Sequence, residues 1–277
     1  MRYPHILARV TDSAWCATDE TLAAITTLLE SRINGEPAAA APLPAAGSAL
    51  RSSALRSEVG PNAISLVSLS GIIGKKLSAM ETMCGGCDLE EFGAAFDAAM
   101  ADPASASVVL LMDSPGGTVT GTPEMHAHIA EAKAVSAKKV YAYTDTKCCS
   151  AAYYLAAACD GIFCAPTAKV GSIGVVAMVR DVSAKNEKDG VKLHVFTNGK
   201  DKALGADGTV TPALAAQIQA EADFLGEMFR ADVLKMRPQI AAEAAQGRAY
   251  YGAEAVALGL ADEVVPSLSS LLAALAA

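Results

Sequence analysis

The stretch VVLLMDSPGG, residues 108–117, decides the fold. Its first five residues form a continuous apolar run, which is typical of a strand buried on both faces of a parallel sheet. Asp113 to Gly117 then read as a tight turn, and Pro123–Val135 follows as a helical segment. Strand, turn and helix in this order make the first half of a βαβ unit. The stretch therefore predicts an α/β fold.

The same alternation continues on both sides of this stretch. Strand-like and helix-like segments that alternate predict stacked βαβ units with right-handed crossovers and a largely parallel sheet. We expect strands at Ala63–Leu69, Val108–Met112, Val140–Tyr143, Gly161–Cys164, Val175–Val179 and Leu193–Thr197. We expect helices at Leu89–Met100 with Asp88 as cap, Pro123–Val135, Ser150–Ala158, Pro212–Gln246 with an interruption near Pro238, and Ser267–Ala277.

Three parts are expected along the chain. Residues 1–35 form a small N-terminal helical segment, in which Thr18 caps a helix and Asn34-Gly35 stops it. Residues 36–61 are rich in Pro, Ala and Ser without periodicity, which is typical of a linker or a processed segment. Residues 62–277 carry all the α/β patterning and make the main domain.

Composition excludes two broad classes of function. The chain of 277 residues is 52% hydrophobic, but alanine supplies about a fifth of it and no apolar stretch reaches the length of about 20 residues that a spanning helix needs. A net charge of −8 lacks the basic surface expected of a nucleic-acid-binding protein. The N-terminus has no apolar signal region, so we expect a cytoplasmic protein without a membrane anchor.

The seven cysteines indicate a reducing compartment with free thiols. Cys84-Gly-Gly-Cys87 is the one pair with the spacing of a metal or redox site. A structural zinc site needs four ligands, and no second pair completes one. We therefore expect no metal here and interpret the segment as a glycine-rich loop that carries two thiols.

Two turns from strand to helix are candidate sites, because sites in open α/β folds lie beyond the carboxyl ends of strands. Ser114-Pro-Gly-Gly117 could aim backbone N–H groups at an oxyanion, or it could be an ordinary turn. Ser150 stands at the opening of an alanine-rich helix, where it could be a nucleophile or a plain N-cap. The vicinal Cys148 and Cys149 fit small buried residues.

A serine nucleophile needs a general base. The four histidines, His5, His126, His128 and His194, do not form a Ser-His-Asp arrangement with Ser150 and a downstream aspartate. A lysine is the other option, since burial lowers its pKa toward neutrality. Lys200 and Lys202 lie in a polar turn, although on spacing alone a solvated basic turn is the ordinary explanation of such a pair.

Six motifs in a fixed order carry a resemblance to a known family. They are SLSGIIG (68–74), DSPGGTV (113–119), SAAYYLAAACDGIFCAP (150–166), VGSIGV (170–175), NGKDKA (198–203) and GRAYYGAEAVALGLADEV (247–264). The series resembles the signal-peptide-peptidase-A-like serine proteases, over about residues 62–265. The resemblance implies the ClpP/crotonase-like fold and a Ser–Lys dyad that works without a cofactor.

The resemblance also implies roles for individual residues. Ser150 takes the place of the nucleophile, and Lys202, rather than Lys200, takes the place of the catalytic lysine. Ser172 corresponds to the serine that hydrogen-bonds the lysine. Gly117 and Ala151, the residue after Ser150, correspond to the donors of the oxyanion hole.

Three departures resemble the bacteriophage branch of this family, the capsid-assembly proteases of phages and prophages. Ala151-Ala152 replaces Gly-Gly, a transmembrane anchor is missing, and residues 1–35 are unlike the cellular enzymes. We therefore expect a homo-oligomeric head maturation protease in the bacterial host, associated with the procapsid. Its substrates would be scaffold or capsid proteins and its own linker, at Ala38–Ala46.

Three other functions fit parts of the pattern. They are a cellular signal-peptide-peptidase-like protease, an acyl-CoA enzyme of the crotonase type, and a head-assembly or scaffolding component without catalysis. The crotonase type does not need a serine at a helix start with a distant lysine. The retained Ser150, Ser172 and Lys202 argue against a component that has lost its activity.

Overall fold

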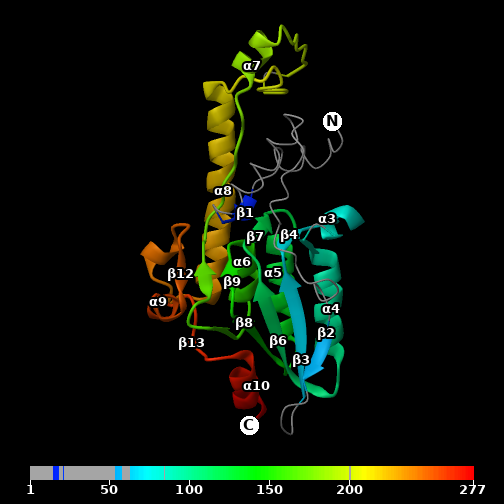
Figure 1. Ribbon diagram of the computed structural model, residues 1–277, viewed down its shortest axis with the longest axis vertical. Helices are drawn as coiled ribbons and strands as arrows, with labels where there is room; N and C mark the ends of the chain where they lie inside the picture. The colour runs from blue at the N-terminus through cyan, green and yellow to red at the C-terminus, as the bar shows by residue number, and fades with distance from the viewer. Residues whose placement is uncertain (1–14, 19–20, 22–53, 58–62, 84, 200) are drawn as a thin grey trace.

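The computed structural model describes residues 15–18, 21, 54–57, 63–83, 85–199 and 201–277. A six-stranded sheet forms the centre of the molecule (Figure 1). Its strands, in spatial order, are β13 (Glu263–Val264), β10 (Gly161–Cys164), β8 (Lys139–Thr144), β6 (Ser105–Asp113), β3 (Ala63–Ser70) and β2 (Ala54–Ser57). All neighbours pair in parallel except β2, which is antiparallel to β3. The expected α/β fold class is confirmed.

The apolar run of β6 is buried on both faces, and this is why it has no polar alternation. Val108 and Leu110 pack in the larger core, with helices α4 (Leu89–Ala101), α5 (Thr122–Ala134) and α6 (Ala151–Ala157). Val109 lies on the opposite face, against Leu271 and Leu272 of α10 (Leu268–Ala276). The sheet is thus covered by helices on both faces, as a parallel sheet requires.

Two smaller sheets continue from the carboxyl ends of the central strands. One contains β1 (Trp15–Ala17), β7 (Gly116–Thr118), β4 (Ile72–Gly74) and β5 (Gly86–Asp88), and the other contains β12 (Ala249–Tyr251), β11 (Lys169–Gly171) and β9 (Lys147–Cys149). β6 leads into β7 through Ser114-Pro115, and β8 leads into β9 through Asp145-Thr146. Both candidate turns therefore lie at the same edge of the central sheet.

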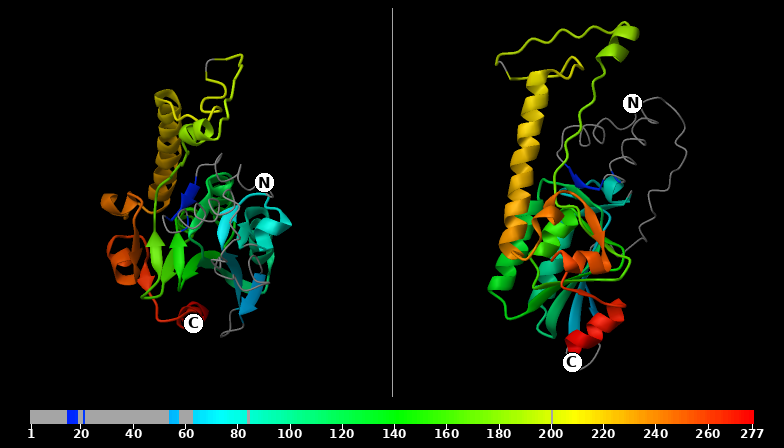
Figure 2. Two further views of the ribbon diagram at one scale, coloured as in Figure 1. Left: turned by 45° about the horizontal axis from the view of Figure 1, so that its top comes forward. Right: turned by 90° about the vertical axis from the view of Figure 1, so that its left-hand side faces the viewer.

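An arm projects from this body (Figures 1 and 2). It consists of residues 177–211, which include α7 (Ser183–Lys188), and of the first turns of α8 (Pro212–Met236). The strands expected at Val175–Val179 and Leu193–Thr197 are wrong: Val176 makes a single bridge with Trp15, and residues 193–197 form no strand. An apolar run becomes a strand only where another strand offers hydrogen bonds, and residues 193–197 lie exposed at the end of the arm.

The other elements expected between residues 62 and 277 are present, with shifts of a few residues at their ends. The long helical segment breaks where Pro238 predicts it, since α8 ends at Met236 and a 3₁₀ turn follows at Ala242–Ala245. The short helices α3 (Ala79–Met83) and α9 (Gly252–Ala257) complete the fold.

The division of the chain at residue 62 stays a prediction. Upstream of it, β1 pairs with β7 and β2 pairs with β3, so two short pieces of the expected N-terminal segment and linker are built into the sheets. The Thr18 hydroxyl accepts a hydrogen bond from the Thr21 N–H at 3.4 Å, as in an N-cap. The rest of the expected helix and Ala38–Ala46 lie outside the described residues.

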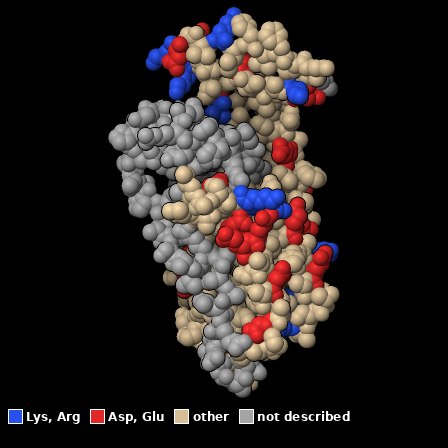
Figure 3. Space-filling model, turned by 90° about the vertical axis from the view of Figure 1, so that its right-hand side faces the viewer, with Lys and Arg blue, Asp and Glu red and all other residues tan. Residues whose placement is uncertain are grey.

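The face that carries α3 and α4 displays acidic side chains around a smaller number of basic ones (Figure 3). Glu90, Glu91 and Asp97 of α4 are exposed there. Asp88 caps this helix, since its carboxylate accepts hydrogen bonds from the N–H groups of Glu90 and Glu91 at 2.8 and 3.4 Å.

Loss of the Asp88 cap should destabilise the protein. We expect Asp88→Ala to lower the free energy of unfolding by about 1–2 kcal/mol, because the side chain is buried and the first N–H groups of α4 lose their acceptor. Asp97→Ala is the matched control in the same helix: it removes an exposed contact with His128 and should change stability by no more than about 0.5 kcal/mol. Urea unfolding measures both variants, and equal losses would contradict the role of the cap.

Candidate active site

The backbone makes an unusual turn at Ser150, between β9 and α6. Ser150 has φ 54° and ψ −117°, a conformation that residues other than glycine rarely adopt. The turn is held from both sides, because the Cys149 N–H donates to Ser114 O at 3.2 Å and the Ser150 N–H donates to Gly171 O at 2.8 Å. Strain of this kind persists where the surroundings over-determine it, and it gathers at functional sites.

The hydroxyl of Ser150 has no hydrogen-bond partner in the described structure. The residue is only 1% exposed, although it begins a helix where an N-cap serine would accept a bond from the next turn. Buried hydroxyls are almost always paired, so an unpaired one calls for an explanation. The side chain is thus not used as a cap, which leaves its oxygen available for chemistry.

Ser172 lies next to Ser150 in space. Gly171 accepts the hydrogen bond from Ser150, and Ser172 follows it with φ 57° and a mostly buried side chain. The Ser172 N–H donates to Arg248 O at 2.9 Å, which ties the segment to the start of β12. The structure therefore brings together two of the residues that the sequence predicts for the site.

The Ser114–Gly117 turn forms the other wall beside Ser150. Ser114 is fully buried, and its hydroxyl donates to Gly71 O at 2.6 Å and accepts from the Gly116 N–H at 3.1 Å. Gly117 lies between β1 and β4, and a Cβ there would stand 1.9 Å from Ile73 O. Glycine is thus required for close packing of the strands. Ala151, the other expected oxyanion donor, is the first residue of α6, and its N–H has no acceptor within the helix.

Lys202 is not near these residues. It is exposed in a turn of the arm, beyond the N-terminus of α8. α8 packs beside α6 at Phe229, which stacks on Tyr154 at 4.3 Å between ring centroids. Pro212, the first residue of α8, lies about 25 Å further along the helix by its rise per residue. The expected dyad is therefore not assembled within one chain in this structure.

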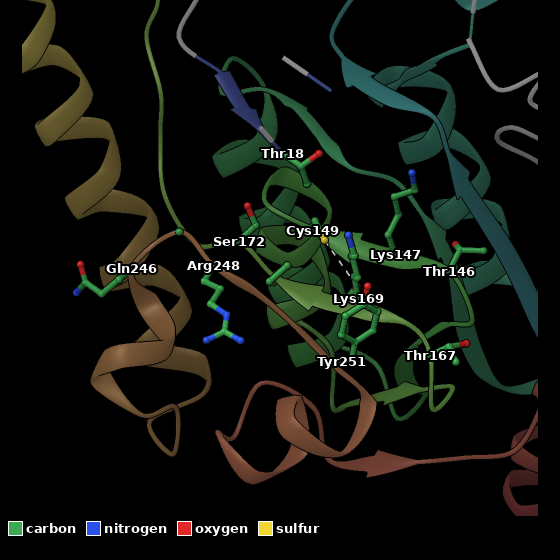
Figure 4. Close-up of a pocket in the computed structure, with 12 residues that line it drawn as sticks. Thr18, Thr146, Lys147, Cys149, Thr167, Lys169, Ser172, Gln246, Arg248 and Tyr251 are labelled. Atoms are coloured by element: carbon green, nitrogen blue, oxygen red, sulfur yellow. Dashed lines mark hydrogen bonds between the residues drawn. The ribbon is translucent and has the colours of Figure 1, made fainter. Parts of the chain in front are cut away.

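A cavity of about 770 Å³ opens beside Ser172 (Figure 4). Thr18, Cys149 and Ser172 surround one part of it. Its other lining includes the basic residues Lys147, Lys169 and Arg248 together with Tyr251. The sequence does not predict these basic residues as neighbours, because they come from β9, β11 and the edge of β12 and no local pattern links them.

Comparison with known proteins identifies the family of the chain. The family model for peptidase family S49 matches residues 132–274, a range that contains Ser150, Ser172 and Lys202. The chain belongs to peptidase family S49. The resemblance predicted from the six motifs is thereby confirmed at the level of the family.

Relatives of this S49 chain include proteases from phage and from bacteria. It is 30% identical to capsid assembly protease C of Escherichia phage lambda, over 76% of this chain and 48% of the relative. It is 32% identical to the probable protease SohB of Haemophilus influenzae, over 58% of this chain and 46% of the relative. The chain thus spans about half the length of these curated relatives.

A solved enoyl-CoA hydratase from Thermoplasma volcanium is similar at 16% identity, with a TM-score of 0.45 and coverage of 82% of this chain and 76% of the other. A likeness of this size carries no argument about the chemistry of the S49 chain. Within the described residues, no helix combines the length and apolar character needed to cross a bilayer.

Three hydrogen bonds to distant parts of the chain support α6, whose seven residues are all buried. The Tyr153 hydroxyl donates to Leu260 O at 2.8 Å, and the Tyr154 hydroxyl donates to the Asp232 carboxylate. His126 Nδ1 donates to Tyr154 O at 2.7 Å. Rigid support of this kind keeps the turn at Ser150 in place.

The buried cysteines that flank α6 are poor nucleophiles. Burial raises the pKa of the Cys148 thiol well above its usual range, and it raises the pKa of Cys159 to about 12. The thiolate is the reactive form of cysteine, so these side chains stay inert at neutral pH. Cys87 is buried in β5, whereas Cys84 lies outside the described residues. In the part of the chain that the structure describes, no three His, Cys, Asp or Glu residues gather as a metal site.

His126 should make the stability of the protein depend on pH. Burial is the main cause that lowers the pKa of His126 below its usual value of 6.5, and the hydrogen bond to Tyr154 only partly offsets it. The unfolded chain therefore binds a proton that the folded protein does not bind, and stability falls as the pH drops below about 6.5.

We expect His126→Asn to flatten this fall, since its amide N–H stands where Nδ1 donates to Tyr154 O. The measurement is the free energy of unfolding of both proteins between about pH 7.5 and pH 5. An equal slope in the two proteins would show that His126 does not link stability to pH.

Proposed function

We propose that the protein is a serine endopeptidase in which Ser150 is the nucleophile. The observation that carries the proposal is the unpaired, buried Oγ of Ser150 at a strained turn between a strand and a helix. Membership of peptidase family S49 supports the same reaction class.

The proposed mechanism is acyl transfer to Ser150. A neutral lysine takes the proton of Ser150 as its Oγ attacks the carbonyl carbon of a substrate peptide bond. The backbone N–H groups of Gly117 and Ala151 stabilise the negative charge on the carbonyl oxygen. The lysine returns the proton to the leaving amine, and a water molecule then hydrolyses the acyl ester. Ser172 orients the lysine.

We assign the lysine to Lys202 of a neighbouring copy of the chain. Lys202 lies on an arm that carries exposed apolar side chains, among them Leu193, Val195 and Phe196, the last of which is 92% exposed. Exposed apolar side chains that gather on one segment are typical of a contact with another protein. A homo-oligomer in which each arm reaches the body of the next copy would join Lys202 to Ser150 and cover these side chains.

The biological role that we propose is head maturation in a phage or prophage. The similarity to capsid assembly protease C of phage lambda supports scaffold or capsid proteins as substrates, in the cytoplasm of the bacterial host and at the procapsid. The similarity to SohB supports the second candidate, a cellular signal-peptide-peptidase-like protease. If no cleavage is found that depends on Ser150 or Lys202, the remaining candidate is a non-catalytic head-assembly component.

Removal of either dyad residue should abolish cleavage. We expect Ser150→Ala and Lys202→Ala each to lower the rate of cleavage of reduced, alkylated casein by more than about a thousandfold. Lys188→Ala, on the same arm, is the matched control and should retain the wild-type rate. If Lys200→Ala, Lys147→Ala or Lys169→Ala abolished cleavage while Lys202→Ala did not, the assignment of the base would be wrong.

Mixing the two inactive variants tests the shared site. Equal amounts of Ser150→Ala and Lys202→Ala should regain up to about a quarter of the wild-type rate, because random assembly unites an intact serine with an intact lysine at some interfaces. Mixtures that stay inactive after dissociation and reassembly would contradict a dyad formed between copies.

The protein should also process its own linker. We expect the intact mass of the wild-type protein to show loss of the N-terminus by cleavage within Ala38–Ala46, because this alanine-rich segment offers small side chains. Ser150→Ala should keep its full mass. Equal masses of the two proteins after prolonged incubation would exclude self-processing.

A further inference from the structure

β1 lies in a groove between two segments of the candidate active site. On one side it is antiparallel to β7, with Trp15 opposite Thr118, Cys16 opposite Gly117 and Ala17 opposite Gly116. The Thr18 N–H extends this ladder and donates to Pro115 O at 3.1 Å. On the other side, Trp15 and Val176 exchange two hydrogen bonds, each 2.9 Å long. β1 is therefore hydrogen-bonded along both edges.

Both walls of this groove are the segments that hold Ser150. Ser114, which precedes Pro115, exchanges hydrogen bonds with β9, since its N–H donates to Lys147 O and its carbonyl accepts from Cys149. Gly171, which accepts the hydrogen bond from Ser150, lies five residues before Val176 in the sequence. Thr18 at the end of β1 lines the same cavity as Cys149 and Ser172 (Figure 4).

The hydrogen bonds that pair β1 with β7 and Val176 are made by its backbone. Main-chain hydrogen bonds of an added strand are available to any extended peptide, and side-chain pockets then select among peptides. Trp15 provides such a side chain, because it is only 6% exposed in the folded protein. A substrate peptide that paired with β7 and with Val176 would need the place that Trp15–Thr18 occupies.

We propose that β1 is an intramolecular pseudosubstrate, which has to leave the groove between β7 and Val176 before another peptide binds beside Ser150. This inference rests on the proposed function for its biological meaning. Its physical content is competition between two extended segments for one groove, and this can be measured without catalysis.

A matched pair of variants isolates the backbone pairing of β1. Thr18→Pro removes the N–H that donates to Pro115 O, whereas Thr18→Ala removes the hydroxyl and keeps the N–H. The chain has one tryptophan, so fluorescence reports directly on Trp15. Both variants are made in the Ser150→Ala chain, which keeps its N-terminus. We expect the emission of Thr18→Pro to shift toward that of an indole in water, and the emission of Thr18→Ala to stay near that of the Ser150→Ala protein.

Peptide binding measures the competition itself. The probe is a fluorescein-labelled peptide with the sequence of residues 13–20, SAWCATDE, and a scrambled peptide is the control. Both Thr18 variants are made in the full chain with Ser150→Ala, and binding is followed by fluorescence anisotropy. We expect the probe to bind about five- to tenfold more tightly to the Thr18→Pro protein than to the Thr18→Ala protein, since β1 loses one backbone hydrogen bond in the former.

The outcomes separate this inference from the proposed function. Equal affinity of the Thr18→Pro and Thr18→Ala proteins, binding that the scrambled peptide matches, or an indole that is already solvent-exposed in the uncleaved Ser150→Ala protein would each overturn the inference. If the affinities differ as expected but no protein with an intact Ser150 cleaves casein, competition for the groove is supported and the proposed function fails. If the Thr18 variants with Ser150 intact cleave casein at equal rates, and the affinities measured in the Ser150→Ala chain are equal, the proposed function stands and the inference fails.

Discussion

The backbone at Ser150 is the constraint on which the rest of the site depends. A residue with a side chain is held at φ 54° because β9 is fixed to Ser114 on one side and Ser150 itself to Gly171 on the other. α6 then enters a core in which all seven of its residues are buried. Alanines supply four of these positions, since small side chains let the helix approach the sheet and α5 closely. The alanines of α6 thus serve close packing.

The molecule has two parts, a body and an arm, to which we assign different tasks. The body holds Ser150, Ser172 and the Ser114–Gly117 turn through backbone hydrogen bonds, and all of these lie at the carboxyl edge of the central sheet. The arm carries Lys202 together with exposed apolar side chains. Under our proposal, assembly of several copies completes the site. Such an enzyme would be active only where its concentration is high, as within a procapsid.

The sequence predicts those parts of the fold whose signals are local. The apolar run at Val108–Met112, the cap at Asp88 and the break before Pro238 each depend on neighbouring residues, and each is present. The strands expected at Val175–Val179 and Leu193–Thr197 were wrong, because strand formation depends on a distant partner that a single segment does not reveal. For the same reason the sequence did not predict β1, which pairs with residues about a hundred positions away.

The candidate site was predictable to a similar extent. The motif order places Ser150 and Ser172 in one site, and the structure brings their segments together. The motif order does not tell whether a lysine comes from the same chain, and the position of Lys202 on the arm is a property of tertiary structure. The basic residues of the cavity were not predicted, since they meet only through the pairing of β9, β11 and β12.

The central claim is that Ser150 is a nucleophile and not a structural residue. Covalent labelling with a fluorophosphonate tests it most directly, with peptide mass spectrometry to locate the adduct. We predict one adduct per chain, on Ser150, which forms on the wild-type protein and is lost in Ser150→Ala. An adduct on Ser114 or Ser172 instead, or a wild-type protein that assembles yet stays unlabelled, would contradict the account.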